Sequence, residues 1–147
     1  MSPDVRLVDD HLLLRILIGE VVDDIDVTDR AVATTGLWYH RLARALANPR
    51  VAGAMTGRLA DADPGLAGEV LRAVTELPAG IELMSMRKLA WPMATLIESG
   101  VRLNLMSLEA LAAAEHLSAT ICLAVVDANP PLIDAARQRG VEVRLFG

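Results

Sequence analysis

Acidic residues follow two largely apolar segments near opposite ends of the sequence. Asp9 and Asp10 come directly after the run 5–8, and Asp127 comes directly after the run 120–126. Short apolar runs of this kind are typical of strands buried in a parallel sheet. Ligands of such sheets bind beyond the carboxyl ends of the strands, so we expect Asp9 and Asp127 to share one acidic hollow. The alternative is structural, with Asp9 as a helix cap and Asp127 as a turn residue.

The elements that must position these acids follow from apolar periodicity and from cap and turn residues. Strands are expected at 5–8, 81–85, 120–126 and 141–146. Helices are expected after Asp10, at 33–46, from Pro64 to about 77, at 86–99, at 108–117, and from Pro130 to about 139. A threonine is the expected cap of the helix at 33–46, Asp63 of the helix from Pro64, and Ser107 of the helix at 108–117. Pro92 is expected to kink the helix at 86–99 or to mark its true start. Residues 21–30 and 48–62 are expected to be mainly connections, the latter loop-like or weakly helical. The alternation predicts an α/β layered domain with a mostly parallel sheet.

Length and composition indicate one domain over residues 1–147. A chain of 147 residues supports one substantial core and is too short for two. Hydrophobic residues make up 53%, which argues against disorder and leaves apolar surface that a homodimer would bury. Cys122 is the only cysteine, which excludes an intrachain disulfide and a thiolate zinc cluster, and its apolar setting predicts a buried, inert thiol.

Charge and hydropathy narrow the possible partners. The net charge of −5 argues against binding nucleic acid through bulk positive charge, and an aromatic content of 3% argues against a base-stacking platform. No run approaches the roughly 20 apolar residues of a membrane helix, and no signal peptide is visible, so we expect a cytoplasmic protein without membrane contact.

Trp38 and Trp91 are expected to be core or interface anchors, and His11, His40 and His116 lack the spacing of metal ligands.

The segment 6–20, in which an aspartate separates an apolar strand from a leucine-rich helix, resembles the opening of PIN domains. These are metal-dependent ribonucleases that include many toxins of bacterial toxin–antitoxin pairs. The segments 107–120 and 135–143 are similar to later parts of the family pattern. The resemblance implies a three-layer α/β domain with a mostly parallel central sheet flanked by helices. Asp9 takes the place of the family's first aspartate, and Asp127 or Asn129 takes the place of its last acid.

The resemblance also implies an acidic site for Mg²⁺ or Mn²⁺, which would activate water for RNA cleavage. The metal ligands implied are Asp9, Asp10, Glu109 and Asp127. Two positions depart from the family pattern, because Arg41 stands where a glutamate is usual and Ser107 stands where the third acid is usual. Glu109 lies two residues farther on, but helix periodicity turns it about 200° from Ser107.

Arg41 leads to the first functional hypothesis. A guanidinium near Asp9 and Asp127 would neutralise them and replace the metal's electrostatic role, leaving weak or absent cleavage at a site of Asp9, Arg41, Ser107 and Asp127. His40 and Arg44 lie near Arg41 in sequence and are candidate nucleic-acid contacts, or else part of a solvated helix face.

Three alternatives remain open at this point. The first is an active, toxin-type ribonuclease that uses Mg²⁺ or Mn²⁺ and binds RNA. The second is a regulator without catalysis, held by an antitoxin-like protein. The third is an unrelated small α/β ligand-binding domain, although the sequence offers it no glycine-rich phosphate loop.

Overall fold

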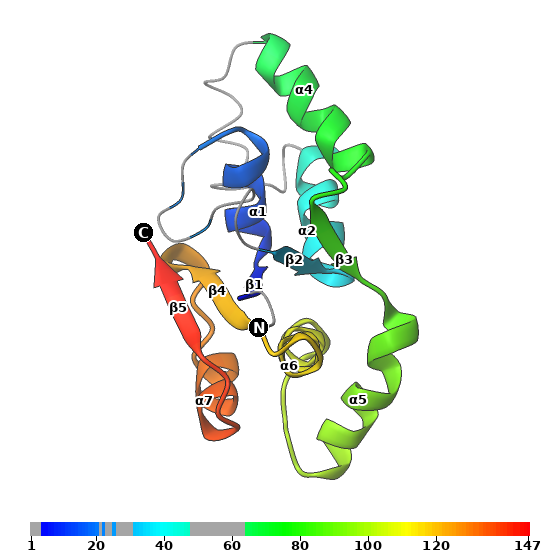
Figure 1. Cartoon of the computed structure of the whole chain (residues 1–147), viewed down its shortest axis with the longest axis vertical. Helices are drawn as coiled ribbons and strands as arrows, with labels where there is room; N and C mark the ends of the chain where they lie inside the picture. Colours follow the sequence, from blue (N-terminus) through cyan, green and yellow to red (C-terminus); the bar gives the residue numbers. More distant parts are fainter. Residues whose placement is uncertain (1–3, 21, 23–24, 26–30, 48–63) are drawn as a thin grey trace.

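The computed structural model describes residues 4–20, 22, 25, 31–47 and 64–147 (Figure 1). The loop expected at 48–62, the cap expected at Asp63 and most of the connection at 21–30 lie outside these residues.

A parallel sheet forms the centre of the described structure, with its five strands in the order β3-β2-β1-β4-β5. The strands are β1 (Arg6–Val8), β2 (Val32–Thr35), β3 (Ile81–Met84), β4 (Thr120–Ala124) and β5 (Val143–Phe146). Leu7 of β1 pairs with Ala33 of β2 on one side and with Ile121 of β4 on the other. The direction in which strands are added therefore switches at β1. The crevice that such a switch creates lies beyond the carboxyl ends of β1 and β4.

Helices cover both faces of this sheet (Figure 1). The helices in the described ranges are α1 (Asp10–Leu17), α2 (Gly36–Ala47), α4 (Pro64–Thr75), α5 (Met86–Glu98), α6 (Leu105–Leu117) and α7 (Pro130–Gln138). Val8 and Cys122 face a core shared with α1, α2 and α4, whereas Leu7 and Ile121 face a core shared with α5, α6 and α7. The expected three-layer α/β fold with a parallel central sheet is confirmed. None of the described helices has the length and apolar character that crossing a bilayer would require.

Strand β2 is the main element that differs from the sequence-based expectation of a helix beginning at Ala33. Its four residues are all buried, so they show no alternation of polar and apolar types that would mark a strand. The Thr34 hydroxyl donates to the Val8 carbonyl at 2.9 Å, which satisfies it inside the sheet. Helix α2 then begins directly at Gly36, where the Thr35 hydroxyl accepts a hydrogen bond from the Trp38 N–H at 3.2 Å. The expected threonine cap is therefore present, but it follows a strand.

Smaller differences concern the ends of elements. Helix α6 begins at Leu105 because Asn104, and not Ser107, caps it; the Asn104 Oδ1 accepts from the Ser107 N–H at 2.8 Å. Strand β4 ends at Ala124, and Val125–Asp127 form one 3₁₀ turn. Pro92 lies inside α5 and does not mark its start. The early end of β4 turns Asp127 back toward the crevice.

Candidate functional site

Asp9 lies at the carboxyl end of β1 and joins that strand to β4. Its Oδ1 accepts from the Leu12 N–H in the first turn of α1, and its Oδ2 accepts from the Ala124 N–H at the end of β4, both at 2.9 Å. The residue is only 1% exposed. This burial raises the pKa of Asp9 to about 6, while the two backbone hydrogen bonds act in the opposite direction. Both oxygens of Asp9 are therefore engaged by the protein itself.

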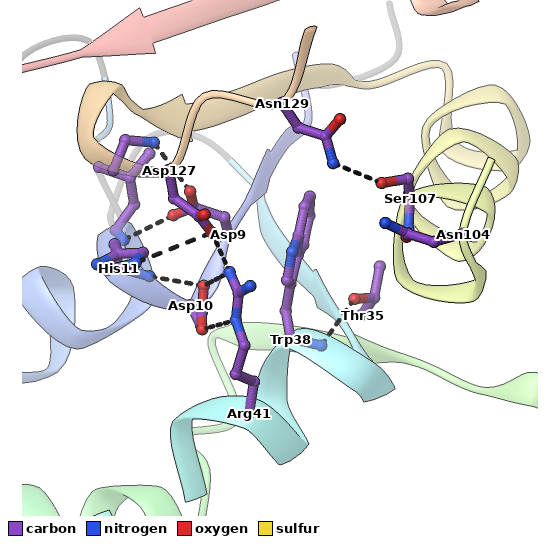
Figure 2. Close-up of polar contacts among 12 residues, drawn as sticks. Asp9, Asp10, His11, Thr35, Trp38, Arg41, Asn104, Ser107, Asp127 and Asn129 are labelled. Atoms are coloured by element: carbon purple, nitrogen blue, oxygen red, sulfur yellow. Dashed lines mark hydrogen bonds and ion pairs between the residues drawn. The ribbon is translucent and has the colours of Figure 1, made fainter. Parts of the chain in front are cut away.

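Arg41 reaches from α2 to two carboxylates on other elements. Its Nε and Nη2 donate to the two oxygens of Asp10, with 2.6 Å between Nη2 and Oδ1, and Nη2 also donates to Asp127 Oδ2. Figure 2 shows the guanidinium lying against both acids. Asp10 is fully buried in the first turn of α1, whereas the Asp127 side chain is 41% exposed. The hydrogen bond with Asp10 is the main reason that the pKa of Arg41 is raised above its ordinary value.

The expectation that Arg41 would neutralise Asp9 and Asp127 is therefore corrected in one respect. Arg41 binds Asp127 as expected, but its second carboxylate is Asp10. The reason is that two backbone N–H groups already occupy the oxygens of Asp9. The carboxylate of Asp10 accepts one backbone hydrogen bond, from the His11 N–H to its Oδ1 at 3.2 Å. A planar guanidinium can add two parallel hydrogen bonds to this carboxylate, and a buried charge is tolerated only when it is paired in this way.

His11 completes a group that the sequence spacing did not reveal. Its Nε2 lies 3.9 Å from Asp127 Oδ2. One ligand atom from each of Asp10, His11 and Asp127 lies within 4.8 Å of the other two. This geometry suits a divalent ion that accepts oxygen and imidazole ligands. However, Arg41 already binds both oxygens of Asp10 and one oxygen of Asp127, so the donor set fits a metal only if Arg41 moves away.

A small cavity of about 70 Å³ adjoins this group. Its lining comes from residues on both sides of the switch point, namely Asp9, Trp38, Arg41, Asn104, Met106, Ser107, Leu123, Asp127, Asn129 and Leu132. The expected convergence of Asp9 and Asp127 on one hollow is therefore observed. On the opposite wall, Asn129 Nδ2 donates to the Ser107 Oγ at 2.8 Å, and Asn129 Oδ1 caps α7 by accepting from the Leu132 N–H at 3.3 Å (Figure 2).

Glu109 has a different environment from the one expected of a metal ligand. It is 2% exposed, and its Oε1 accepts from the Leu37 N–H at 2.9 Å, at the start of α2. A carboxylate at this place stabilises the positive end of the helix dipole. It does not line the cavity that holds Asp9 and Asp127. The resemblance-based assignment of Glu109 to the metal is thus not supported by its contacts, in agreement with the orientation expected from helix periodicity.

Two further expected residues lie outside the cavity, and the cysteine behaves as expected. His40 and Arg44 are exposed on α2 and do not line the hollow, although Arg41 of the same helix does.

Cys122 is fully buried in β4, and burial raises the pKa of its thiol to about 12, so a reactive thiolate is disfavoured. Trp38 is buried and also lines the cavity, whereas Trp91 is 78% exposed.

No protein-family model matches this chain, and no curated protein matches it.

Proposed function

We propose that this chain is a PIN-like domain, related to metal-dependent ribonucleases, in which an arginine replaces the metal and RNA cleavage is weak or absent. The main support is that Arg41, at the position of a family glutamate, binds both Asp10 and Asp127. The positions matched to the family's other acids, Asp9, Ser107 and either Asp127 or Asn129, line the same cavity. Residues that are far apart in sequence thus meet in the way that the resemblance requires.

The contacts of these residues account for the proposed loss of activity. Metal-dependent hydrolysis needs several oxygen ligands that can reach an ion carrying an activated water. Asp9 directs both oxygens to backbone N–H groups, and Ser107 offers only a neutral hydroxyl that already accepts from Asn129. Asp127 also lines the cavity and Asp10 lies beside it, and the guanidinium of Arg41 forms ion pairs with both carboxylates. An ion would have to compete with this permanent cation.

Calorimetric titration with Mn²⁺ tests the proposal. We expect the wild-type protein to bind Mn²⁺ with a dissociation constant weaker than about 1 mM, and to release no product from RNA in Mg²⁺ above the background of the assay. Binding at about 1 mM or tighter that is lost in both Asp9→Asn and Asp127→Asn contradicts the arginine-filled site. Asp134→Asn, which removes an exposed carboxylate from α7, is the matched control.

An active ribonuclease is the second candidate, and the close approach of Asp10, His11 and Asp127 favours it. In that case Arg41 would move away from the carboxylates when Mg²⁺ or Mn²⁺ and RNA bind together. Cleavage of RNA that requires the ion and is abolished by Asp127→Asn selects this function. The same preparation must lose the activity on chelation of the ion.

A regulator that binds a partner without catalysis is the third candidate. Val125 and Val126 are 53% and 75% exposed on the 3₁₀ turn that carries Asp127, next to the cavity. Apolar side chains at the edge of a polar site suit the contact of another protein, such as an antitoxin-like chain. Copurification of a stoichiometric small protein that is released by Val126→Asp favours this function.

A further inference from the structure

Helix α5 carries a second stripe of residues in addition to the one that packs into the core. Leu89, Met93 and Leu96 are buried toward the rest of the protein, and α5 contacts α6. The opposite side presents four exposed residues at spacings of four, three and four positions, namely Arg87, Trp91, Ala94 and Glu98. Residues at these spacings lie in one row along a helix. Figure 1 shows α5 at the border of the molecule.

The centre of this outward stripe is apolar, and its ends are charged with opposite signs. Trp91 is 78% exposed, the highest value among the large apolar side chains of the described chain. Ala94 lies next to it and leaves space for a large side chain. Arg87 and Glu98 lie at equal separations in sequence from the midpoint between Trp91 and Ala94. Along the stripe, the order is therefore a positive residue, a large apolar residue, a small apolar residue and a negative residue.

The charges at both ends of α5 are unfavourable for the isolated helix. Arg87 and Lys88 lie in its first turn, and Glu98 is its last residue, whereas a helix dipole favours acids at the start and bases at the end. Within the described part of the chain, the side chains of Arg87 and Glu98 have no ion-pair partner. An antiparallel helix packed on the stripe would reverse this situation, because it brings its negative end to Arg87 and its positive end to Glu98.

We propose that two copies of this chain pair through the outward stripe of α5, with the two helices antiparallel and related by a two-fold axis. The register that places Arg87 opposite Glu98 of the other copy also places Trp91 opposite Ala94, and the two-fold axis repeats both contacts. The large residue then packs on the small one, and each charge meets its opposite. A second copy fits because the stripe is complementary to itself.

This pairing is independent of the function proposed for the cavity. The α5 stripe contains none of the residues that line the cavity, so metal binding at the cavity does not change the surface that pairs.

Charge exchange between the two ends tests the register. Sedimentation equilibrium of the wild-type chain over about 1 to 100 µM should show a concentration-dependent dimer. Arg87→Glu places two acids together in each symmetric contact, and Glu98→Arg places two bases together. Each variant should raise the dimer dissociation constant by about tenfold or more. Both substitutions agree with the dipole of α5, so a loss of pairing through unfolding is not expected.

Mixing the two variants provides the decisive measurement. An equimolar mixture of Arg87→Glu and Glu98→Arg should form a heterodimer, because each contact again joins opposite charges, and the double variant should recover self-association. Arg137→Glu on α7 and Glu76→Arg after α4 make the same changes of charge at other exposed positions and should leave the dimer unchanged.

Trp91 supplies a second readout, since Trp91→Ala should weaken the dimer and dimerisation should shift the emission of Trp91 to shorter wavelength. A wild-type chain that is monomeric up to about 100 µM overturns the proposal. A dimer that tolerates both single charge reversals overturns it as well.

Discussion

Arg41 and Asp10 form a two-point ion pair in which the guanidinium of a side chain that is 36% exposed binds both oxygens of a fully buried carboxylate. Removing the cation leaves the charge of Asp10 buried without compensation. We expect Arg41→Gln to lower the free energy of unfolding by about 2–4 kcal/mol, a range reduced from that of fully buried pairs because Arg41 remains partly in water. Urea denaturation at neutral pH measures the change.

Arg41→Lys and the double variant Asp10→Asn/Arg41→Gln are the controls for this prediction. Lysine keeps the charge but cannot form two parallel hydrogen bonds, so it should recover only part of the loss. The double variant removes the buried charge of Asp10 together with its cation and should be more stable than Arg41→Gln alone. Equal stability of Arg41→Gln and the wild type would show that Asp10 does not depend on this cation.

The raised pKa of Asp9 predicts a specific pH dependence of stability. Its folded pKa is about 6, compared with an ordinary value of 3.8, so the folded protein takes up a proton between pH 6 and 4 that the unfolded chain does not bind. The contribution of Asp9 to the free energy of unfolding should therefore increase as the pH falls through this window, by up to about 3 kcal/mol. Denaturation curves of the wild type and Asp9→Asn at several pH values measure the difference.

The comparison of the two proteins isolates Asp9, because other acids titrate in both of them. The stability of the wild type relative to Asp9→Asn should rise on acidification and reach a plateau below about pH 4. A difference that stays constant from pH 7 to pH 4 contradicts the raised pKa.

Glu109 should contribute to stability and not to metal binding. Its carboxylate accepts from the Leu37 N–H at the start of α2 while almost fully buried. Glu109→Ala should lower the free energy of unfolding by about 1–3 kcal/mol, because a helix-terminal N–H then loses its acceptor inside the protein. Glu109→Gln, which keeps an acceptor oxygen, should lose less. Any Mn²⁺ affinity measured for the wild type should be unchanged in both variants.

Restoring acids to the cavity should restore metal binding. Arg41→Glu removes the competing cation and releases Asp10 and Asp127, and Ser107→Asp adds a carboxylate to the same hollow. We expect the double variant to bind Mn²⁺ with a dissociation constant of about 1 mM or tighter, by calorimetry. Ser107→Asp alone should bind more weakly because Arg41 remains. A double variant that folds but shows no Mn²⁺ binding would show that these positions do not converge on one ion.

The fold was largely predictable because the central strands β1 and β4 are buried and appear in the sequence as short, largely apolar runs. These runs and the short segments that form the edge strands β3 and β5 are separated by segments with helical periodicity, so the layered α/β arrangement follows. Strand β2 was missed because its two threonines lead into α2 without a connecting loop. A threonine before a helix is also the expected pattern of a cap, and here Thr35 serves both elements.

The candidate site was predictable only in part. The convergence of Asp9 and Asp127 follows from their positions after strands. The preference of Arg41 for Asp10 could not be read from the sequence, because it depends on backbone N–H groups of Leu12 and Ala124 that occupy Asp9. The role of His11 was missed for a similar reason, since its neighbour Asp127 comes from the other end of the chain.

The place of β1 in the sheet has a consequence for how the polypeptide matures during synthesis. β1 is made first, yet it occupies the middle of the sheet, and Arg6 pairs with Thr120 on one of its sides. While a ribosome is still translating, that flank has no strand to join until β4 has been synthesised. Such long-range pairing makes folding slow, and completion of the sheet around β1 depends on a strand that is made much later.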